Sequence, residues 1–303
     1  MSDNRVQPCS TVVGPIGVFD SGYGGLTILD AIRRQLPQYD YLYLGDNARA
    51  PYGPRSYSVV YEFTRQAVAQ LFQMGCHLVI LACNTASAKA LRTIQQQDLP
   101  RWAGGTTAFP GAGGTTALPQ RRVLGIIRPT AEVIGQLTKS RHVGVMATEG
   151  TIKSQSYEME IEKLHPDIHV TGVACPFWVP LVEYDEATSL GADYFVKKYI
   201  DQMMEADPLI DAAILGCTHY PLLLTKIRHY MPPQVQVIAQ GSYVAQSLAD
   251  YLQRHPEIAQ HCSKGGHTRY FTSENPERFA EQAQRFLNEP VTATHIDLVE
   301  PLK

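Results

Sequence analysis

The sequence lacks the features of a membrane-spanning, secreted or nucleic-acid-binding protein. No apolar run approaches the length of a membrane span, and residues 1–6 are too polar to open a signal peptide. The net charge is only -3, with both signs interspersed, so no broad basic surface is available for nucleic acid or a membrane. We therefore expect a cytoplasmic protein that binds a small molecule and neither nucleic acid nor a membrane.

Paired cysteines are also lacking. The six cysteines are scattered, without a Cys-x-x-Cys motif and without zinc-like spacing to histidine. This pattern argues against a disulfide framework and a structural metal, so we expect free thiols and no metal site. Three of them lie in apolar surroundings and are predicted to be packed core residues: Cys76, Cys175 and Cys262.

What the sequence does contain is two apolar runs that each end at a cysteine. The run 78–82 leads directly into Cys83, and the run 212–216 leads into Cys217. An unbroken apolar run of this length is typical of a parallel strand covered by helices on both faces. Ligands bind at the carboxyl ends of such strands, so both thiols are predicted to face a binding site.

Strand-like and helix-like segments alternate along the chain. Further strands are predicted at 15–19, 41–44, 123–127, 142–146, 168–173 and 235–238. Such alternation implies parallel sheets with right-handed crossovers, and the length of 303 residues favours two domains or two similar halves. We predict two pseudo-symmetric α/β domains with the active site in the cleft between them. The first comprises residues 14–100 plus about 246–303, and the second residues 121–245.

Two segments are predicted to be poorly ordered. Residues 103–110 are nearly repeated by residues 112–119, and this nine-residue duplication is rich in glycine, threonine and proline. The composition favours a flexible loop over 101–120, and two copies are too few for a solenoid. Residues 1–13 are predicted to form a disordered leader.

Helical spacing near the C-terminus predicts a packed tail helix over 276–287. Its apolar positions are Phe279, Ala283, Phe286 and Leu287. We expect this helix to cover the core of one domain. Three aromatic residues are likewise expected in the core, rather than on a stacking surface: Tyr41, Tyr43 and Trp178.

Two thiols that face one bound molecule from opposite sides suit the inversion of a stereocentre. A thiol acts as a base only as thiolate, which needs a helix N-terminus, a nearby cation or suitable hydrogen bonds. One thiolate could remove a proton from one face while the opposite thiol returns a proton to the other. The symmetry of the residues would then match the symmetry of a reversible reaction.

Five short motifs occur in a specific order. They are Phe-Asp-Ser-Gly-Tyr-Gly-Gly-Leu at 19–26, Pro-Tyr-Gly at 51–53, Ala-Cys-Asn-Thr-Ala-Ser-Ala at 82–88, Pro-Leu-Val-Glu at 180–183 and Gly-Cys-Thr-His-Tyr-Pro at 216–221. From about residue 14 to 245 the chain resembles the glutamate racemases of the aspartate/glutamate racemase family. The resemblance implies a cofactor-independent interconversion of L- and D-glutamate, which supplies D-glutamate for peptidoglycan. By the same analogy the protein is a homodimer.

The resemblance also assigns roles to individual residues. It implies that Cys83 acts on the D-enantiomer and Cys217 on the L-enantiomer. The further catalytic residues that it implies are Asp20, His219, Glu183 and Asp46. The residues implied to hold the substrate are Asp20, Ser21, Tyr52, Gly53, Asn84, Thr85, Thr151, Thr218 and His219. Neutral donors of this kind can bind two carboxylates without an arginine that would compete for the thiolates.

The chemistry adds an expectation about closure of the cleft. The α-proton is far less acidic than a thiol, so the carbanion needs surrounding donors and exclusion of water. We therefore expect substrate to close the cleft.

The sequence departs from the family pattern in two places. Residues 238–242 read Ile-Ala-Gln-Gly-Ser, where the family often has Asp-Ser-Gly, so any role of that acid is absent. The duplicated loop is the second departure.

Plainer interpretations exist for the residues beside the thiols. Asp20 and Thr151 could be helix caps, and Asp46 could satisfy loop amides. Glu183 could be a solvated helix residue, and His219 could be structural, although its position two residues after a thiol would let it tune that thiol.

Three alternative functions also fit parts of the sequence. The chain could racemise aspartate or another acidic amino acid, or it could be an inactive glutamate-binding regulatory relative. A thiol hydrolase that uses Cys217 and His219 would leave the Cys83 motif unexplained.

Overall fold

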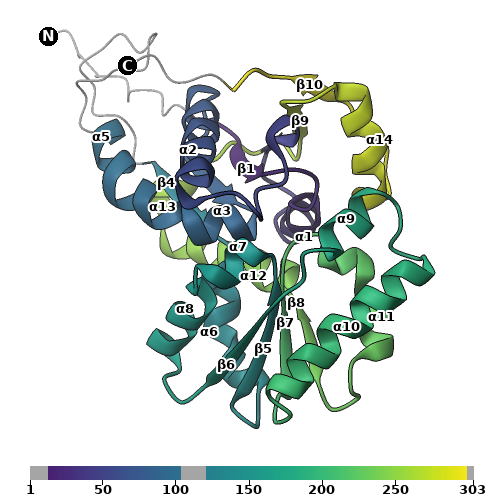
Figure 1. The fold of residues 1–303 in the computed structure, drawn as a ribbon. Helices are drawn as coiled ribbons and strands as arrows, with labels where there is room; N and C mark the ends of the chain where they lie inside the picture. The colour runs from purple at the N-terminus through teal and green to yellow at the C-terminus, as the bar shows by residue number, and fades with distance from the viewer. Residues whose placement is uncertain (1–12, 104–120, 299–303) are drawn as a thin grey trace, which may run out of the picture.

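The computed structural model describes residues 13–103 and 121–298. The predicted leader, except for Val13, and the duplicated loop after residue 103 lie outside the described residues. The described strands form two separate parallel sheets with helices around them (Figure 1). This arrangement confirms the predicted fold class of two parallel-sheet α/β units.

The first sheet has the strand order β10-β9-β2-β1-β3-β4. Its strands are β1 (Ile16–Asp20), β2 (Tyr41–Gly45), β3 (Leu78–Leu81), β4 (Arg122–Gly125), β9 (Thr268–Thr272) and β10 (Ala293–His295). The second sheet has the order β6-β5-β7-β8. Its strands are β5 (His142–Ala147), β6 (His169–Ala174), β7 (Ala212–Gly216) and β8 (Gln236–Ala239). The two strands that lead into Cys83 and Cys217, β3 and β7, are both interior strands, which explains their unbroken apolar sequences.

Helices connect successive strands and cover the sheets. From the N-terminus to the second sheet they are α1 (Leu26–Gln35), α2 (Tyr57–Gln73), α3 (Asn84–Lys89), α4 (Leu91–Thr93), α5 (Leu99–Ala103), α6 (Ile127–Leu137), α7 (Glu149–Lys153) and α8 (Ser156–Leu164). They continue with α9 (Trp178–Glu183), α10 (Leu190–Ala206), α11 (Leu224–Tyr230), α12 (Gly241–Arg254), α13 (Pro256–Ala259) and α14 (Pro276–Leu287). Three short helices of other types complete the series: the 3-10 helices η1 (Asn47–Arg49) and η3 (Tyr220–Leu223) and the π-helix η2 (Ile94–Asp98). Helix α12 packs along α1 and returns the chain from the second sheet to the first.

One predicted strand lies in a different sheet from the one expected. The segment 123–127 was expected in the second domain, but β4 pairs in parallel with β3 at the edge of the first sheet. The crossover from β3 to β4 runs through α3, α4 and α5, and such a connection returns the chain to the position next to the strand it left. Residue Ile127 already belongs to α6. The domain boundaries themselves stay a prediction.

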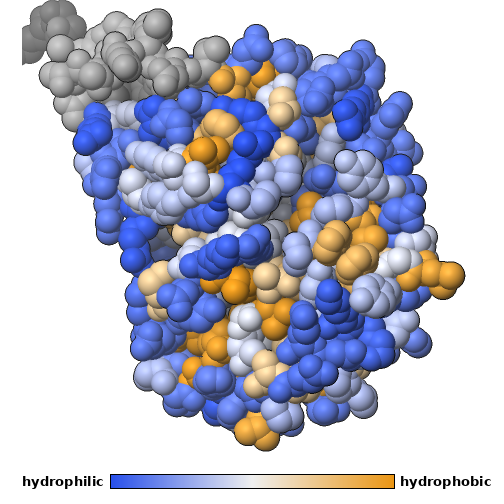
Figure 2. Space-filling model, viewed as in Figure 1, coloured by the Kyte–Doolittle hydropathy of each residue, from blue (hydrophilic) through white to orange (hydrophobic). Residues whose placement is uncertain are grey.

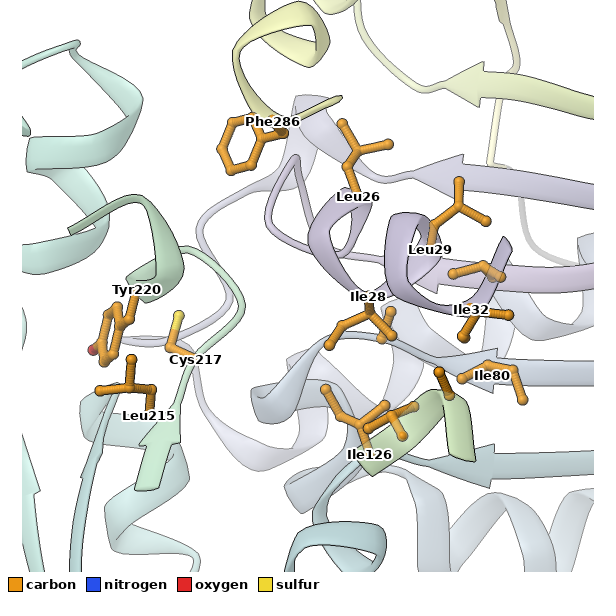
Figure 3. Close-up of a cluster of buried hydrophobic side chains, with 14 of the residues drawn as sticks. Leu26, Ile28, Leu29, Ile32, Ile80, Ile126, Leu215, Cys217, Tyr220 and Phe286 are labelled. Carbon is orange, nitrogen blue, oxygen red and sulfur yellow. The ribbon is translucent and has the colours of Figure 1, made fainter. Parts of the chain in front are cut away.

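The core follows the predicted burial pattern. The aromatic residues Tyr41, Tyr43 and Trp178 are buried, and so are all three cysteines expected in the core. In Figure 3, Ile28, Leu29 and Ile32 of α1 lie in one apolar cluster with Ile126, while Cys217 and Tyr220 lie in the turn that follows β7 of the neighbouring sheet. The same cluster therefore continues from one sheet to the other.

The surface mixes hydrophilic and hydrophobic side chains. On the face in Figure 2 the hydrophobic residues stand in small groups among hydrophilic ones. The exposed large hydrophobic residues of the described chain include Phe177, Leu190 and Tyr194, which lie in or beside α9 and α10. Among the helices of residues 13–103 and 121–298, none is both long and apolar enough to cross a membrane.

The tail helix α14 packs on the first unit as predicted. The ring of Phe279 is fully buried, with its centroid 5.6 Å from that of Tyr23 and 6.0 Å from that of Tyr43. We predict that Phe279→Ala lowers the free energy of unfolding by about 3–5 kcal/mol, because the lost ring leaves a cavity in the core. Urea unfolding measures the change. The control is Phe177→Ala, whose ring is 49% exposed and should cost less than about 1 kcal/mol. Equal losses in the two variants would contradict the assignment of α14 to the core.

Candidate active site

Cys83 follows β3 after one residue, Ala82, and caps helix α3. Its Sγ accepts from the backbone N–H of Ala86 at 3.4 Å, and the Ser21 hydroxyl lies 3.4 Å from the same sulfur. The pKa of the thiol is raised to about 12, chiefly by burial and then by the nearby charge of Asp20, while the hydrogen bonds with Ser21 and Ala86 oppose the rise and Cys217 adds to it. Cys83 is therefore a protonated thiol at neutral pH, and it is close enough to Cys217 to sense its charge.

Cys217 lies directly after β7 and begins a chain of three side chains. The Sγ atom is 3.9 Å from His219 Nδ1, and His219 Nε2 is 3.0 Å from Glu183 Oε1. Burial alone would lower the pKa of His219, but Cys217 and Glu183 together raise it to about 10. The imidazolium is thus held between the thiol and the carboxylate, where it can stabilise a thiolate at Cys217.

Asp20 connects the surroundings of the two thiols. It ends β1, is 1% exposed, and accepts from the N–H of Gly22 at 2.8 Å. Burial raises the pKa of Asp20, and His219 opposes that shift. Asp20 therefore lies within electrostatic reach of both Cys83 and His219.

A close approach of two loops holds these sides together. A Cβ atom at Gly24 would lie 2.4 Å from both Thr218 Oγ1 and His219 Nδ1, so only glycine fits at this point. The Thr27 hydroxyl donates to the carbonyl of Thr218 at 3.1 Å. The loop after β1 and the turn after β7 are therefore in direct contact.

Three threonine hydroxyls meet beside Cys83. Thr85 Oγ1 is 2.9 Å from Thr148 Oγ1 and 3.4 Å from Thr151 Oγ1, and the last two are 3.1 Å apart. Thr148 is the N-cap of α7, so Thr151 has no capping role. Thr148 was not predicted as a site residue, although it follows β5 directly, in a position similar to that of Cys83, which comes one residue further from the end of β3. Gly53 lies against it, since a Cβ there would be 3.2 Å from Thr148 Cβ.

The side chain of Asn84 is bound at both ends. Its Oδ1 accepts from the Tyr157 hydroxyl at 2.7 Å, and its Nδ2 donates to Gln240 Oε1 at 2.8 Å. Neither partner was predicted as a site residue. The sequence did contain one signal for Gln240, because it lies in the segment 238–242, where the chain departs from the family pattern.

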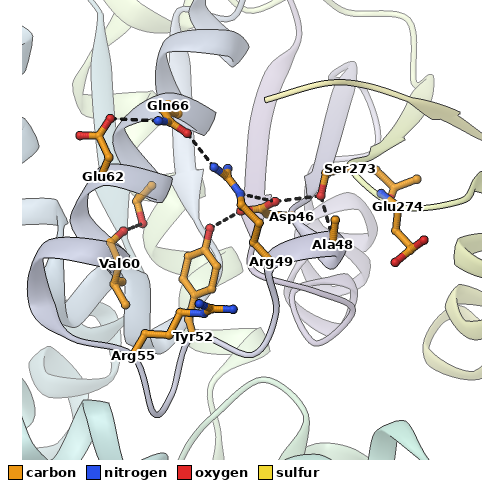
Figure 4. A network of polar contacts seen from close by, with 12 residues as sticks. Asp46, Ala48, Arg49, Tyr52, Arg55, Val60, Glu62, Gln66, Ser273 and Glu274 are labelled. Atoms are coloured by element: carbon orange, nitrogen blue, oxygen red, sulfur yellow. Dashed lines mark hydrogen bonds and ion pairs between the residues drawn. The ribbon is translucent and has the colours of Figure 1, made fainter. Parts of the chain in front are cut away.

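Asp46 and Tyr52 form a separate polar cluster within the first unit (Figure 4). The fully buried carboxylate of Asp46 accepts from the Tyr52 hydroxyl, from Arg49 Nε at 2.7 Å and from Ser273 Oγ at 2.8 Å. Its oxygens thus bind side chains rather than the loop amides considered from the sequence. The catalytic role predicted for Asp46 and the binding role predicted for Tyr52 stay predictions.

A cavity of about 200 Å³ adjoins the second thiol. Its lining includes Cys217, Thr218, Thr27 and Gln240. Within residues 13–103 and 121–298, no group of three or more histidine, cysteine or acidic side chains is placed to hold a metal ion. The chemically active groups here are thus two thiols from different sheets, an imidazolium and surrounding hydroxyl and amide groups.

Comparisons with known proteins find relatives over most of the chain. Residues 16–248 match the family model described as Asp/Glu/Hydantoin racemase. The glutamate racemase of Ruegeria sp. (strain TM1040) is 38% identical over 287 residues, which cover 91% of this chain and 98% of that protein.

Solved structures of glutamate racemases are similar to this chain over most of its length. A glutamate racemase isoform from Bacillus anthracis superposes with a TM-score of 0.81 and 32% identity, covering 96% of this chain and 99% of the other. The glutamate racemase of Francisella tularensis, solved in complex with D-glutamate, has a TM-score of 0.77 and 29% identity, covering 94% and 97%.

The raised pKa of His219 predicts how stability depends on pH. The folded-state pKa is about 10, above the ordinary value of 6.5, so the stabilisation from its proton is complete below about pH 6.5 and is lost as the pH rises through about 10. We predict that the difference in free energy of unfolding between the wild type and His219→Asn shrinks from pH 6.5 to 10. Urea unfolding across this range measures it. The exposed His229→Asn serves as matched control. If the difference in free energy of unfolding between the wild type and His219→Asn grew with pH, it would contradict a protonated His219 beside Glu183.

Proposed function

This chain belongs to the Asp/Glu/hydantoin racemase family and is an isomerase, and we propose that it interconverts L- and D-glutamate. The observation that carries the proposal is the placement of Cys83 and Cys217 after interior strands of two different sheets, with Asp20 within electrostatic reach of Cys83 and of His219. Relatives named glutamate racemase match nearly the whole chain, which favours glutamate over other substrates.

In the proposed mechanism the two thiols work in opposite protonation states. With L-glutamate, the Cys217 thiolate takes the α-proton: the Cα–H bond breaks, an S–H bond forms and the electron pair stays on the substrate. The Cys83 thiol then gives its proton to the opposite face of Cα and becomes a thiolate. With D-glutamate the same steps run in reverse. Each turnover exchanges the protonation states of the two thiols, so a further turnover in the same direction begins after Cys217 has lost a proton to solvent and Cys83 has gained one from it.

The residues around the thiols support these states. The His219 imidazolium, held by Glu183 at 3.0 Å, stabilises a Cys217 thiolate. Ser21 and the N–H of Ala86 are placed to stabilise a Cys83 thiolate when the roles exchange. The high pKa of Cys83, about 12, suits a thiol that delivers a proton to a strongly basic carbanion.

Neutral groups bind the substrate in this proposal. Hydroxyl and amide groups gather beside the thiols, chiefly those of Asn84, Thr85, Thr151 and Thr218. Such donors can hold two carboxylates and stabilise negative charge that develops at the α-carbon. Closure of the two units around glutamate would exclude water and strengthen these interactions.

The biological role follows from the product. We propose that the enzyme supplies D-glutamate for peptidoglycan synthesis in the cytoplasm and needs no cofactor. A homodimer is proposed from the family resemblance alone.

We predict that Cys83→Ala and Cys217→Ala each slow racemisation by about a thousandfold, because neither variant has a proton-transfer group on both faces. Circular dichroism follows optical activity, and proton NMR in D2O follows loss of the Cα–H signal, starting from each enantiomer of glutamate. The matched control is Cys262→Ala, a buried thiol at the far side of the first sheet, which should racemise within about twofold of the wild type.

The outcomes separate the alternatives. If the wild type racemises aspartate but not glutamate, the protein is an aspartate racemase. Glutamate binding without exchange would indicate an inactive relative. Full racemisation by either cysteine variant would rule out the two-thiol mechanism.

A further inference from the structure

A directed chain of hydrogen bonds fixes the orientation of Asn84. Gln240 Nε2 donates to the backbone carbonyl of Ile126 at 3.0 Å and to Thr130 Oγ1 at 3.3 Å. A carbonyl can only accept, so the amide nitrogen of Gln240 must face Ile126 and its Oε1 must face Asn84. Asn84 is then obliged to present Nδ2 to Gln240 and Oδ1 to the Tyr157 hydroxyl.

This chain lies where the polypeptide crosses between the sheets. Ile126 follows β4, the last strand before the chain moves to the second sheet, and Gln240 follows β8, the last strand before it returns. The Gln240 side chain therefore ties the two crossings to each other and to Asn84. Gln240, Asn84 and Tyr157 are all buried, with exposed fractions of 3%, 2% and 1%, so each lost hydrogen bond would leave a buried polar atom without a partner.

The chain also touches the surroundings of both thiols. Asn84 follows Cys83 directly, and Gln240 lines the 200 Å³ cavity together with Cys217. Asn84 Nδ2 carries two hydrogens, and Gln240 occupies one of them. Because the amide is planar, the hydrogen bonds with Gln240 and Tyr157 together fix the direction of the second hydrogen.

We propose that Gln240 is a positioning residue for the racemase reaction, which holds the Asn84 amide so that its second N–H donates to bound glutamate beside Cys83. The inference rests on the proposed function and extends it to a residue at which this sequence departs from the family pattern. Gln240 acts through Asn84 and does not itself touch the substrate.

A double-mutant cycle tests the proposal. The proteins are the wild type, Gln240→Met, Asn84→Ala and the double variant, assayed by circular dichroism in both directions. Gln240→Met keeps the length of the side chain but can neither donate nor accept, and we expect it to raise KM about tenfold with a smaller change in kcat. In the Asn84→Ala background the same change should alter KM by no more than about twofold, because the group it positions is gone.

Three controls make the cycle decisive. Gln246→Met makes the same chemical change on α12, at an exposed side chain that binds Gln35 and Asp250, and should leave KM within about twofold of the wild type. Gln240→Glu, as a protonated acid, can still accept from Asn84 and donate to Ile126, so it should recover most of the loss in KM. If Gln240→Met does not fold, Gln240→Asn replaces it in the cycle, because its side chain is one methylene too short to bridge Ile126 and Asn84. Since L- and D-glutamate are equal in energy, kcat/KM must fall by the same factor in both directions.

If the two residues acted independently, the fold-changes in KM of Gln240→Met and Asn84→Ala would multiply in the double variant. That result would overturn the proposal, and so would an unchanged KM in Gln240→Met. Failure of the proposed function can be told apart from failure of the Gln240 proposal. If the racemase function is wrong, the wild type itself racemises neither glutamate nor aspartate. In that case calorimetric titration of the same four proteins with D-glutamate still measures the coupling between Gln240 and Asn84.

Discussion

The contact between the glycine loop after β1 and the turn after β7 holds the candidate site together. At Gly24 a side chain would overlap both Thr218 and His219, with a Cβ only 2.4 Å from each. The absence of a side chain therefore lets the carboxyl edges of two separate sheets meet. Through this contact Asp20 comes within electrostatic reach of His219, and Cys83 within reach of Cys217. The rest of the chemistry depends on that proximity, because a single thiol can serve only one face of a substrate.

Much of the fold could be predicted because the relevant signals are local. The apolar runs before Cys83 and Cys217 mark interior strands, and the spacing of Phe279, Ala283 and Phe286 marks a helix that is buried on one side. Apolar runs do not say which sheet a strand joins, which is why β4 was placed in the wrong unit. β9 was missed because its sequence, Thr-Arg-Tyr-Phe-Thr, mixes polar and aromatic residues and has no apolar run, although the strand pairs with β2 and β10 on its two sides.

The site was predictable where the motifs are contiguous and less so where it depends on distant partners. His219 and Cys217 are two residues apart, but the third member of their chain, Glu183, is 36 residues away and was found only through resemblance. Asp46 binds Ser273 across 227 residues, a pairing that no local pattern indicates. The amide chain from Ile126 through Gln240 to Asn84 has the same character, since its polarity follows from one backbone carbonyl that only the folded structure brings near.

The central claim is that the two thiols face one substrate carbon from opposite sides. A crystal structure of the wild-type enzyme with D-glutamate bound tests it most directly. The account predicts that the α-carbon lies between the sulfur atoms of Cys83 and Cys217, roughly 3.5 Å from each and on opposite faces. Glutamate bound with both sulfurs on the same face of the α-carbon, or bound away from one of them, would contradict it.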